Sequence, residues 1–355
     1  MKILLLGNAY FRGELEEQGH QVLLCTSNPS RPQDVPKGPL PVDIHQVLAA
    51  LPSGWQPDLI FLGDDSKFPQ FLGLEFLDIP LAWYAIDSHR HPWHRDYAAA
   101  FDLIFVAQKD YLNRYRQDSA RPVVAWLPLF CRPERDRVLN LPKTHDLAFV
   151  GTLDPLLHPE RVRLIEEIKK HFPLYAAGGD YVPIFNAAKL VLNQCSFNDL
   201  NFRTFQALGC GSFLLMENIG NGLSELFQDK VHLALYAKGN VAQILELTHY
   251  YLAHEAEREE IAAQGHAAVM QAHTARHRVA AILDAIQGQD VSDLVKRRQA
   301  RLPDIALKLA TAYVRIVNAY ETFERSHPHL ISRDSATAKE MYNYLATNTL
   351  KGWGG

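Results

Sequence analysis

Short runs of apolar residues, separated by longer stretches of mixed polarity, recur along the first part of the chain. The first run covers residues 2–7 and ends at a glycine. Continuous apolar runs of this length are typical of parallel strands buried on both faces, and the stretches between them are long enough for crossover helices. The alternation indicates an α/β fold with a mainly parallel sheet. Strands are predicted at residues 2–7, 21–26, 59–63, 81–86, 103–107 and 123–127.

The pattern breaks over residues 128–143, a stretch with prolines at 128, 133 and 142, and then starts again. A second α/β unit is expected here, because apolar runs again alternate with helix-compatible segments. Its strands are predicted at residues 146–151, 174–177, 189–193, 213–217 and 232–236, and its helices at 160–171, 181–187, 202–208 and 222–228.

Helical periodicity replaces the strand runs from residue 241 onward. Segments 241–253, 255–271 and 276–287 are expected to close the second unit, and residues 306–325 carry apolar side chains at helical spacing. The sequence therefore predicts three parts, which are a first domain at residues 1–140, a second at 141–288 and a helical C-terminal extension at 289–355.

Composition and charge narrow the functional classes. The 355 residues are 47% hydrophobic and carry a formal charge of −4, from 36 basic and 40 acidic residues. This is enough apolar material for large cores, and it excludes a globally disordered chain. A weakly acidic balance gives no electrostatic footprint for nucleic acid, so nucleic acid is not expected as a partner.

The cysteines and the N-terminus bear on the compartment. The four cysteines stand at positions 25, 131, 195 and 210, too far apart for a zinc-type site or a dense disulfide framework. The first apolar run is too short for a signal-peptide core or a membrane span. We therefore expect a cytoplasmic protein without a transmembrane segment.

Residues at the predicted strand ends are the candidates for chemistry, because ligands of parallel α/β sheets bind beyond the carboxyl ends of the strands. Residues 87–94 place an acid, three histidines and an arginine after an apolar strand. Asp87 and His89 can serve as a base and its orienting partner, since a carboxylate stabilises a protonated imidazole. A polar capping loop is one alternative. A His-x-His-x-x-His metal site is another, but no second ligand cluster accompanies it, so no metal is expected.

A second candidate lies around the predicted helix at residues 202–208. Asn198 and Asn201 precede this helix and Arg203 stands in its first turn. Free N–H groups at a helix start attract anions, and a guanidinium can bind a phosphate through two hydrogen bonds. A surface arginine with ordinary capping asparagines is the alternative. Residues 220–225 form a glycine-containing turn, but they match neither G-x-G-x-x-G nor the G-x-x-x-x-G-K-[ST] phosphate loop.

Several motifs occur in the order found in one known family. The chain resembles the CgeB-like glycosyltransferases, of the spore maturation protein type, at residues 86–89, 101–108, 126–129, 149–152, 161, 185–193, 201–211 and 222–227. The resemblance spans about residues 1–285 and does not extend to residues 290–355. It implies the GT-B architecture, with two tandem Rossmann-like domains facing a cleft. In that architecture the C-terminal domain binds a nucleotide-sugar donor and the N-terminal domain faces the acceptor.

The resemblance also implies roles for particular residues. Asp87 and His89 are implied as the catalytic residues, and Arg203 with Lys189 as the groups that neutralise the donor diphosphate. Gln206 is implied as the ribose contact, at a position where relatives usually keep an acid. The full implied set for the donor is Gly151, Thr152, Lys189, Asn193, Asn198, Arg203, Gln206, Gly222, Leu223, Ser224 and Glu225. No cofactor is implied, because the nucleoside diphosphate sugar is a co-substrate.

The sequence thus predicts a metal-independent glycosyltransferase that moves a sugar from a nucleoside diphosphate sugar to a nucleophile on a protein, glycan or small molecule. The nucleotide, the sugar, the acceptor and the inverting or retaining course stay open. So do two alternatives, a GT-B nucleotide-sugar epimerase and a non-catalytic nucleotide-sugar-binding partner subunit. The second would suit Asn198 and Gln206, which stand where related retaining enzymes carry two glutamates.

Overall fold

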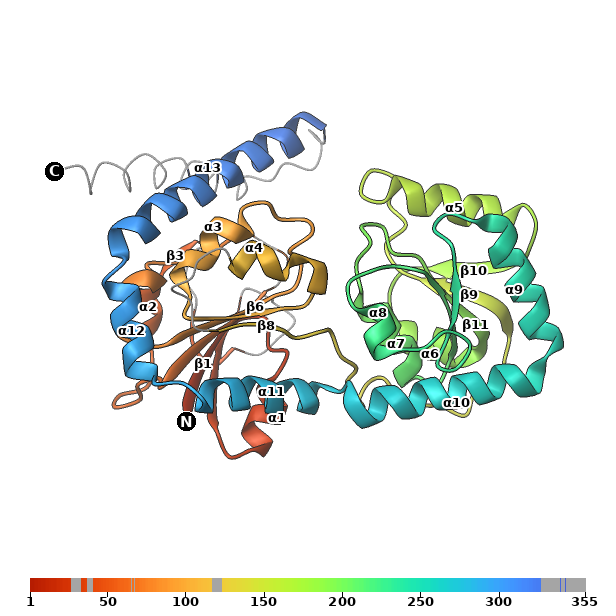
Figure 1. Cartoon of the computed structure of the whole chain (residues 1–355), viewed down its shortest axis with the longest axis horizontal. Coiled ribbons are helices and arrows are strands. Elements are labelled where there is room, and N and C mark those ends of the chain that lie inside the picture. The colour runs from red at the N-terminus through yellow and green to blue at the C-terminus, as the bar shows by residue number, and fades with distance from the viewer. Residues whose placement is uncertain are drawn as a thin grey trace. The chain divides into compact units, whose positions relative to one another are not determined.

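The computed structural model describes residues 1–26, 33–36, 41–64, 66, 68–116, 123–326, 339 and 342. These residues form two compact units (Figure 1). Unit 1 comprises Met1–Leu127 and the chain from Val279 onward, and unit 2 comprises Pro128–Arg278. Each unit has its own parallel sheet and its own apolar core.

Unit 1 contains a six-stranded parallel sheet with the order β2-β1-β4-β6-β7-β8. The apolar runs form these strands because both faces of the sheet are covered, which leaves side chains such as Leu4 and Ala82 fully buried. The strands are β1 (Lys2–Gly7), β2 (Gln21–Cys25), β4 (Leu59–Gly63), β6 (Leu81–Ala85), β7 (Leu103–Val106) and β8 (Val123–Trp126). The strands predicted for this part of the chain are therefore confirmed.

Unit 1 also contains short elements that the sequence pattern did not predict. A separate pair of strands, β3 (Val42–Asp43) and β5 (Phe71–Leu72), is too short to carry a periodic signal. The short helices are α1 (Arg12–Glu17), α2 (Ile44–Ala49), α3 (His94–Tyr97) and α4 (Leu112–Arg116), with 3-10 turns η1 (Leu74–Phe76), η2 (Ala98–Ala100) and η3 (Lys109–Tyr111).

The C-terminal helices α12 (Val291–Gln299) and α13 (Leu302–Ser326) belong to unit 1. Helix α13 packs against α3 (Figure 1). In α12 the buried Arg298 forms an ion pair with Asp102 and donates to the carbonyls of Leu77 and Ile79. The predicted helical character is confirmed, but these helices share the core of unit 1 and do not form a separate extension. The rest of the predicted extension, residues 327–355, lies outside the described residues except for 339 and 342.

Unit 2 contains a five-stranded parallel sheet with the order β10-β9-β11-β12-β13. Its strands are β9 (His145–Val150), β10 (Leu174–Ala177), β11 (Ala188–Asn193), β12 (Phe213–Glu217) and β13 (Ala234–Tyr236). Its helices are α5 (Pro159–Lys169), α6 (Tyr181–Ala187), α7 (Phe202–Gly209), α8 (Leu223–Leu226), α9 (Val241–Ala253) and α10 (Glu255–Ala272). Helices α5 and α9 pack on one another, and α7 packs against α10 (Figure 1). No helix among the described residues is long and apolar enough to cross a membrane.

The boundaries between the units differ from those predicted at residues 140/141 and 288/289. The proline-containing stretch after Pro128 belongs to unit 2. The side chain of Asn186 holds it there by donating to the carbonyl of Arg137 at 3.1 Å and accepting from the amide of Leu139 at 2.6 Å. At the other end α11 (Ala275–Gln287) runs from unit 2 into unit 1, so it does not close the second unit as predicted.

Candidate active site

Arg203 in the first turn of α7 is held by the carboxyl ends of two neighbouring strands. Its Nε donates to the carbonyl of Val150 at 2.6 Å, and its Nη1 donates to the side-chain oxygen of Asn193 at 2.7 Å. A Cβ at Gly151 would lie 2.2 Å from Nη2 of Arg203, so only glycine leaves room for the guanidinium. Gly151, directly after β9, therefore leaves the space that the Arg203 side chain occupies.

Asn193 at the end of β11 orients Arg203. Its side-chain nitrogen donates to Asn201 at 3.1 Å and to the hydroxyl of Thr204 at 3.0 Å, which turns its oxygen toward the guanidinium. Asn193 is fully buried and does not line the pocket described next. Sequence reasoning chose it as a ligand contact, whereas the structure places it behind Arg203.

A pocket of about 470 Å³ opens in front of Arg203. We call it the arginine pocket, because Arg161 and Arg203 both line it. The guanidinium groups of Arg203 and Arg161 lie over the ring of Phe149, 4.5 and 5.6 Å from its centroid. Its lining residues are Val150, Gly151, Thr152, Arg161, Gly178, Gly179, Tyr181, Phe185, Asp199, Asn201, Phe202, Arg203 and Gln206. Of the predicted donor contacts, it brings together Gly151, Thr152, Arg203 and Gln206.

Arg161 of α5 supplies the second cation of this pocket, and sequence reasoning assigned it no site role. It is 7% exposed, and it donates from Nε to the side chain of Gln194 at 3.0 Å and from Nη1 to the carbonyl of Thr152 at 3.2 Å. Its place within the series of family motifs was the signal that could have identified it.

The electrostatics of the pocket favour an anion. Burial, and then the charge of Arg161, lower the pKa of Arg203 to about 10. Asp199 also lines the pocket, but within the described part of the chain no carboxylate lies within 4.0 Å of the Arg203 guanidinium. A cation that is partly removed from water and has no close counter-ion is costly, and an anionic ligand would relieve that cost.

Lys189 lies away from the pocket, contrary to the prediction. It is the second residue of β11, near the amino end of that strand, and its Nζ pairs with Asp146 of β9 at 2.7 Å. Ligands of such sheets bind at the carboxyl ends of the strands. The structure therefore does not support Lys189 as a partner of the diphosphate.

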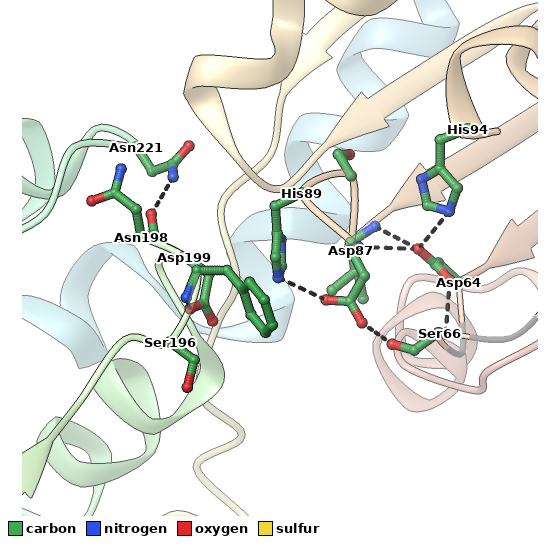
Figure 2. A network of polar contacts seen from close by, with 12 residues as sticks. Asp64, Ser66, Asp87, His89, His94, Ser196, Asn198, Asp199 and Asn221 are labelled. Carbon is green, nitrogen blue, oxygen red and sulfur yellow. Dashed lines mark hydrogen bonds and ion pairs between the residues drawn. The ribbon is translucent and has the colours of Figure 1, made fainter. Parts of the chain in front are cut away.

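Gly222, which directly precedes α8, and the first residues of α8 do not line the pocket either. Gly222 has φ +79°, Leu223 is buried, and Ser224 and Glu225 are exposed. Asn221 ties this turn to Asn198 by donating to its carbonyl at 2.5 Å, as Figure 2 shows. Asn198, which follows β11, is thus linked to the turn that leads into α8, and neither Asn198 nor residues 222–225 line the arginine pocket.

A second cluster of polar side chains lies in unit 1, mostly on the residues that follow β4 and β6. We call Asp64, Ser66, Asp87, His89 and His94 the carboxylate network (Figure 2). The hydroxyl of Ser66 donates to the carboxylate of Asp87, and Nε2 of His89 lies 4.0 Å from the other oxygen of that carboxylate. The structure therefore brings the predicted catalytic pair together.

Asp64 directly follows the predicted strand at residues 59–63 and so was among the strand-end candidates, but sequence reasoning gave it no specific role. It accepts hydrogen bonds from the amides of Ser66, Ile86 and Asp87 at 2.8, 2.9 and 3.2 Å. Burial, and then the charge of Asp87, raise its pKa to about 7. Its position at the end of β4, the neighbour of β6 in the sheet, was the signal available, although that pairing is not visible in the sequence. Asp65, which follows it, lies outside the described residues.

The histidines of residues 87–94 form no metal site in the described residues. Nε2 of His94 lies 3.9 Å from the Asp64 carboxylate, and the His94 ring meets the Trp93 ring edge to face and lies tilted against the His91 ring. No group of three or more His, Cys, Asp or Glu side chains in the described part could hold a metal ion. Burial lowers the pKa of His91 to about 4, so its ring is neutral near pH 7.

Comparisons with known proteins bear on the fold and on the class of function. Residues 143–284 match a family described as glycosyl transferase-like. A search of curated proteins gave no match. Among solved structures, a sucrose-phosphate synthase from Thermosynechococcus elongatus has a TM-score of 0.57 at 13% identity, over 81% of this chain and 98% of that one. HepE of Anabaena, solved in complex with UDP, has a TM-score of 0.54 at 12% identity, over 81% and 100%.

A glycosyltransferase from Rickettsia africae is similar to the same extent, with a TM-score of 0.54 at 10% identity, over 81% of this chain and 99% of that one. At such identities the likeness shows the fold, which is GT-B with two Rossmann-like domains, as the sequence predicted. The family match lies almost wholly within unit 2, where the arginine pocket is. The family match and the fold together support a nucleotide-sugar glycosyltransferase.

Proposed function

We propose that this protein transfers a sugar from a nucleoside diphosphate sugar to an acceptor nucleophile, and that the arginine pocket holds the diphosphate of the donor. One observation carries this proposal. Arg203 is a half-buried guanidinium seated by a glycine and an asparagine, beside the buried Arg161 and without a carboxylate ion pair among the described residues. Such a site suits a ligand with two adjacent negative charges.

The same two side chains would act in the reaction as well as in binding. Negative charge builds on the leaving diphosphate as the glycosidic bond breaks, and fixed donors aimed at that charge lower the barrier. Arg161 and Arg203 supply this positive charge from the protein. Metal independence is part of the proposal, so transfer is expected to persist in excess EDTA.

Asp87 and His89 are the proposed base and its orienting partner. An acceptor hydroxyl must lose a proton when it attacks, and an inverting course requires a base for this step. The 4.0 Å separation between the His89 imidazole and the Asp87 carboxylate lets each influence the charge of the other. In a retaining course the same side chains would position the sugar.

We further propose the CgeB-like subtype and a cytoplasmic location. The subtype is supported by the ordered motifs, whose residues Gly151, Arg161, Arg203 and Gln206 are among those that line the arginine pocket. The location fits the four cysteines, which are buried and form no disulfide in the described residues. HepE was solved with UDP and with UDP-glucose, so uridine nucleotides are the first donors to test here.

Calorimetry on Arg203→Ala tests the proposal. A charge-assisted hydrogen bond contributes about 1.5–3 kcal/mol, so UDP is expected to bind roughly 10- to 150-fold more weakly while uridine binding changes little. Arg163→Ala is the matched control, because Arg163 is an exposed arginine two residues from Arg161 on α5. An equal loss for UDP and uridine would contradict the assignment of the diphosphate to Arg203.

Product analysis separates the two alternatives left open by the sequence. Wild-type protein is incubated with a panel of nucleoside diphosphate sugars, with and without candidate acceptors. Release of the nucleoside diphosphate with a glycosylated acceptor supports transfer. An isomerised donor without transfer identifies an epimerase, and tight binding without any product identifies a non-catalytic subunit.

A further inference from the structure

The turn that carries Asp87 and His89 is fixed to the core of unit 1 from two sides. On one side the Asp64 carboxylate accepts the amides of Ile86 and Asp87 through the same oxygen. On the other side the hydroxyl of Ser88 contacts the Tyr115 hydroxyl at 2.7 Å, and Arg114 donates to the Ser88 carbonyl at 3.1 Å. Every residue from 86 to 88 is therefore bonded to another element.

Asp64 also reaches the carboxylate of Asp87 through a bridging residue. Ser66 donates its amide to one oxygen of Asp64 and its hydroxyl to Asp87, so one serine joins both carboxylates (Figure 2). The amide bonds fix where the Asp87 backbone lies, and the hydroxyl bond fixes where its carboxylate points. Both depend on Asp64 accepting hydrogen bonds from three N–H donors.

We propose that Asp64 is a positioning residue for the reaction, because its carboxylate holds Ile86, Asp87 and Ser66 in the arrangement that presents the Asp87 carboxylate. This inference rests on the proposed function, in which Asp87 acts on the acceptor or the sugar. Asp64 itself is 6% exposed and touches no substrate in this assignment, so it acts through Asp87. A displacement of about 1 Å at a reacting group can reduce turnover roughly 100-fold, so a residue that holds the Asp87 carboxylate in place is expected to affect turnover strongly.

The ionised form of Asp64 is the form that can do this. An ionised carboxylate accepts at both oxygens, whereas a protonated one carries an O–H that faces N–H donors. The raised pKa of Asp64, about 7, therefore makes the positioning depend on pH in the physiological range. The groups facing Asp64 are Asp87 after β6, His94 and Tyr97 of α3, and, through His94, the rings of His91 and Trp93.

The neighbours on α3 do not supply a counter-charge. Burial lowers the pKa of His94 well below its usual value, and His89, His91 and Arg114 add to that shift, so the His94 ring stays neutral. Burial also raises the pKa of Tyr97, which keeps its hydroxyl protonated. Proton uptake by Asp64 is thus the titration expected to change the turn at residues 86–87 near neutral pH.

The test is the substitution Asp64→Asn, which keeps the size of the side chain and removes the charge. An asparagine presents one oxygen and one NH2 group, so it cannot accept from all three amides. We expect faster hydrogen exchange at the amides of Ile86 and Asp87, a kcat lowered roughly 10- to 100-fold, and unchanged UDP affinity. We also expect the rise of wild-type kcat through about pH 7 to be lost.

Glu75→Gln is the matched control. Glu75 is another partly buried acid of unit 1, with a pKa raised by burial to about 6, and it makes no described contact with Asp87. It is expected to leave amide exchange at residues 86–87 and the pH profile unchanged. If Asp64→Asn does not fold, Ser66→Ala replaces it, because it removes only the hydroxyl that donates to Asp87 and is expected to lower kcat with little change in melting temperature.

The outcomes separate this inference from the function on which it rests. A wild-type protein that turns over no nucleotide sugar refutes the proposed function, and the amide exchange of Asp64→Asn then still tests the hydrogen bonds. An active wild type with an equally active, equally pH-dependent Asp64→Asn overturns the inference alone. Loss of melting temperature with full activity per folded molecule also overturns it, because a purely structural role predicts that result.

Discussion

Units 1 and 2 both place buried and half-buried charged side chains beyond the carboxyl ends of their parallel sheets, but the charges have opposite signs. In unit 2 Arg161 and Arg203 both lie over the ring of Phe149. In unit 1 the carboxylate of Asp64 accepts a hydrogen bond from the backbone amide of Asp87. The common fold supplies the position and the backbone partners. The side chains decide whether that position holds an anion or a proton acceptor.

The two sites also differ in what completes them. Burial shifts both groups toward their neutral forms, since the pKa of Arg203 falls to about 10 and that of Asp64 rises to about 7. For Arg203 the protein provides carbonyl and amide oxygens, and a diphosphate would supply the missing negative charge. For Asp64 the protein provides three N–H donors, so its site is complete without a ligand.

The largest expected effect comes from the unit 1 site. Asp87→Ala should lower turnover by about 10²- to 10⁴-fold, the usual contribution of a general base, while UDP affinity stays near the wild-type value. His89→Ala should lower turnover as well. The measurements are kcat, UDP affinity and melting temperature for both variants.

Asp110→Ala is the control for this prediction, because Asp110 is an exposed carboxylate of unit 1 outside the network. It should keep full turnover. Full turnover in both Asp87→Ala and His89→Ala would remove the pair from the mechanism. Weakened UDP binding in these variants would contradict the proposed division of roles, in which the carboxylate network accepts a proton and the arginine pocket binds the diphosphate.

A smaller effect is expected from Gly151→Ala in unit 2. The added methyl group would lie 2.2 Å from Nη2 of Arg203 and 3.0 Å from Cζ of Phe149, so the guanidinium must leave its seat. UDP binding should weaken toward the level of Arg203→Ala. In the double variant the two effects should not add, because both act through the same side chain.

Gly178→Ala is the matched control, since Gly178 also lines the pocket but a Cβ there would meet nothing closer than 3.9 Å. It should bind UDP nearly as the wild type does. Calorimetry on the four variants measures the coupling. Additive losses in Gly151→Ala and Arg203→Ala would show that the glycine serves the pocket in another way.

The strands were predictable from the sequence, because each is a continuous apolar run between polar segments. Predicted and observed strands agree within one or two residues at nearly every end, as at residues 2–7 and 213–217. The assignment of helices to cores was not predictable. The apolar spacing of residues 306–325 indicates a helix but does not say which sheet it covers, and α13 covers unit 1.

The candidate site shows the same limit. Gly151, Thr152 and Arg203 line one pocket because they follow a predicted strand end or begin a predicted helix, whereas Gln206 was identified only through the family resemblance. Lys189 could have been excluded from the sequence, since it opens a predicted strand and so lies at the wrong end. The motif series and the strand-end position marked Arg161 and Asp64, but their partners depend on pairings between strands, β9 with β11 and β4 with β6, that no linear pattern contains.

The smallest expected effect concerns Gln206, the partly exposed pocket residue on α7 that stands where related enzymes usually carry an acid. If its side chain accepts from a ribose hydroxyl, Gln206→Glu replaces a neutral acceptor with a charged one. Charge-assisted hydrogen bonds are stronger by about 1 kcal/mol, so UDP should bind roughly fivefold more tightly. Gln206→Ala should weaken binding to a similar extent.

The comparison of UDP with 2′,3′-dideoxy-UDP makes this prediction specific. The dideoxy nucleotide keeps both phosphates and the base but lacks the hydroxyls that would donate to residue 206. The gain in Gln206→Glu should therefore disappear with it, and the added negative charge should then weaken binding, because it lies in the same pocket as the diphosphate. A collapse of UDP binding in Gln206→Glu with the fold unchanged would show that the amide is required. Residue 206 would then act as a hydrogen-bond donor to the ligand, as the two arginines do, and not as an acceptor from the ribose.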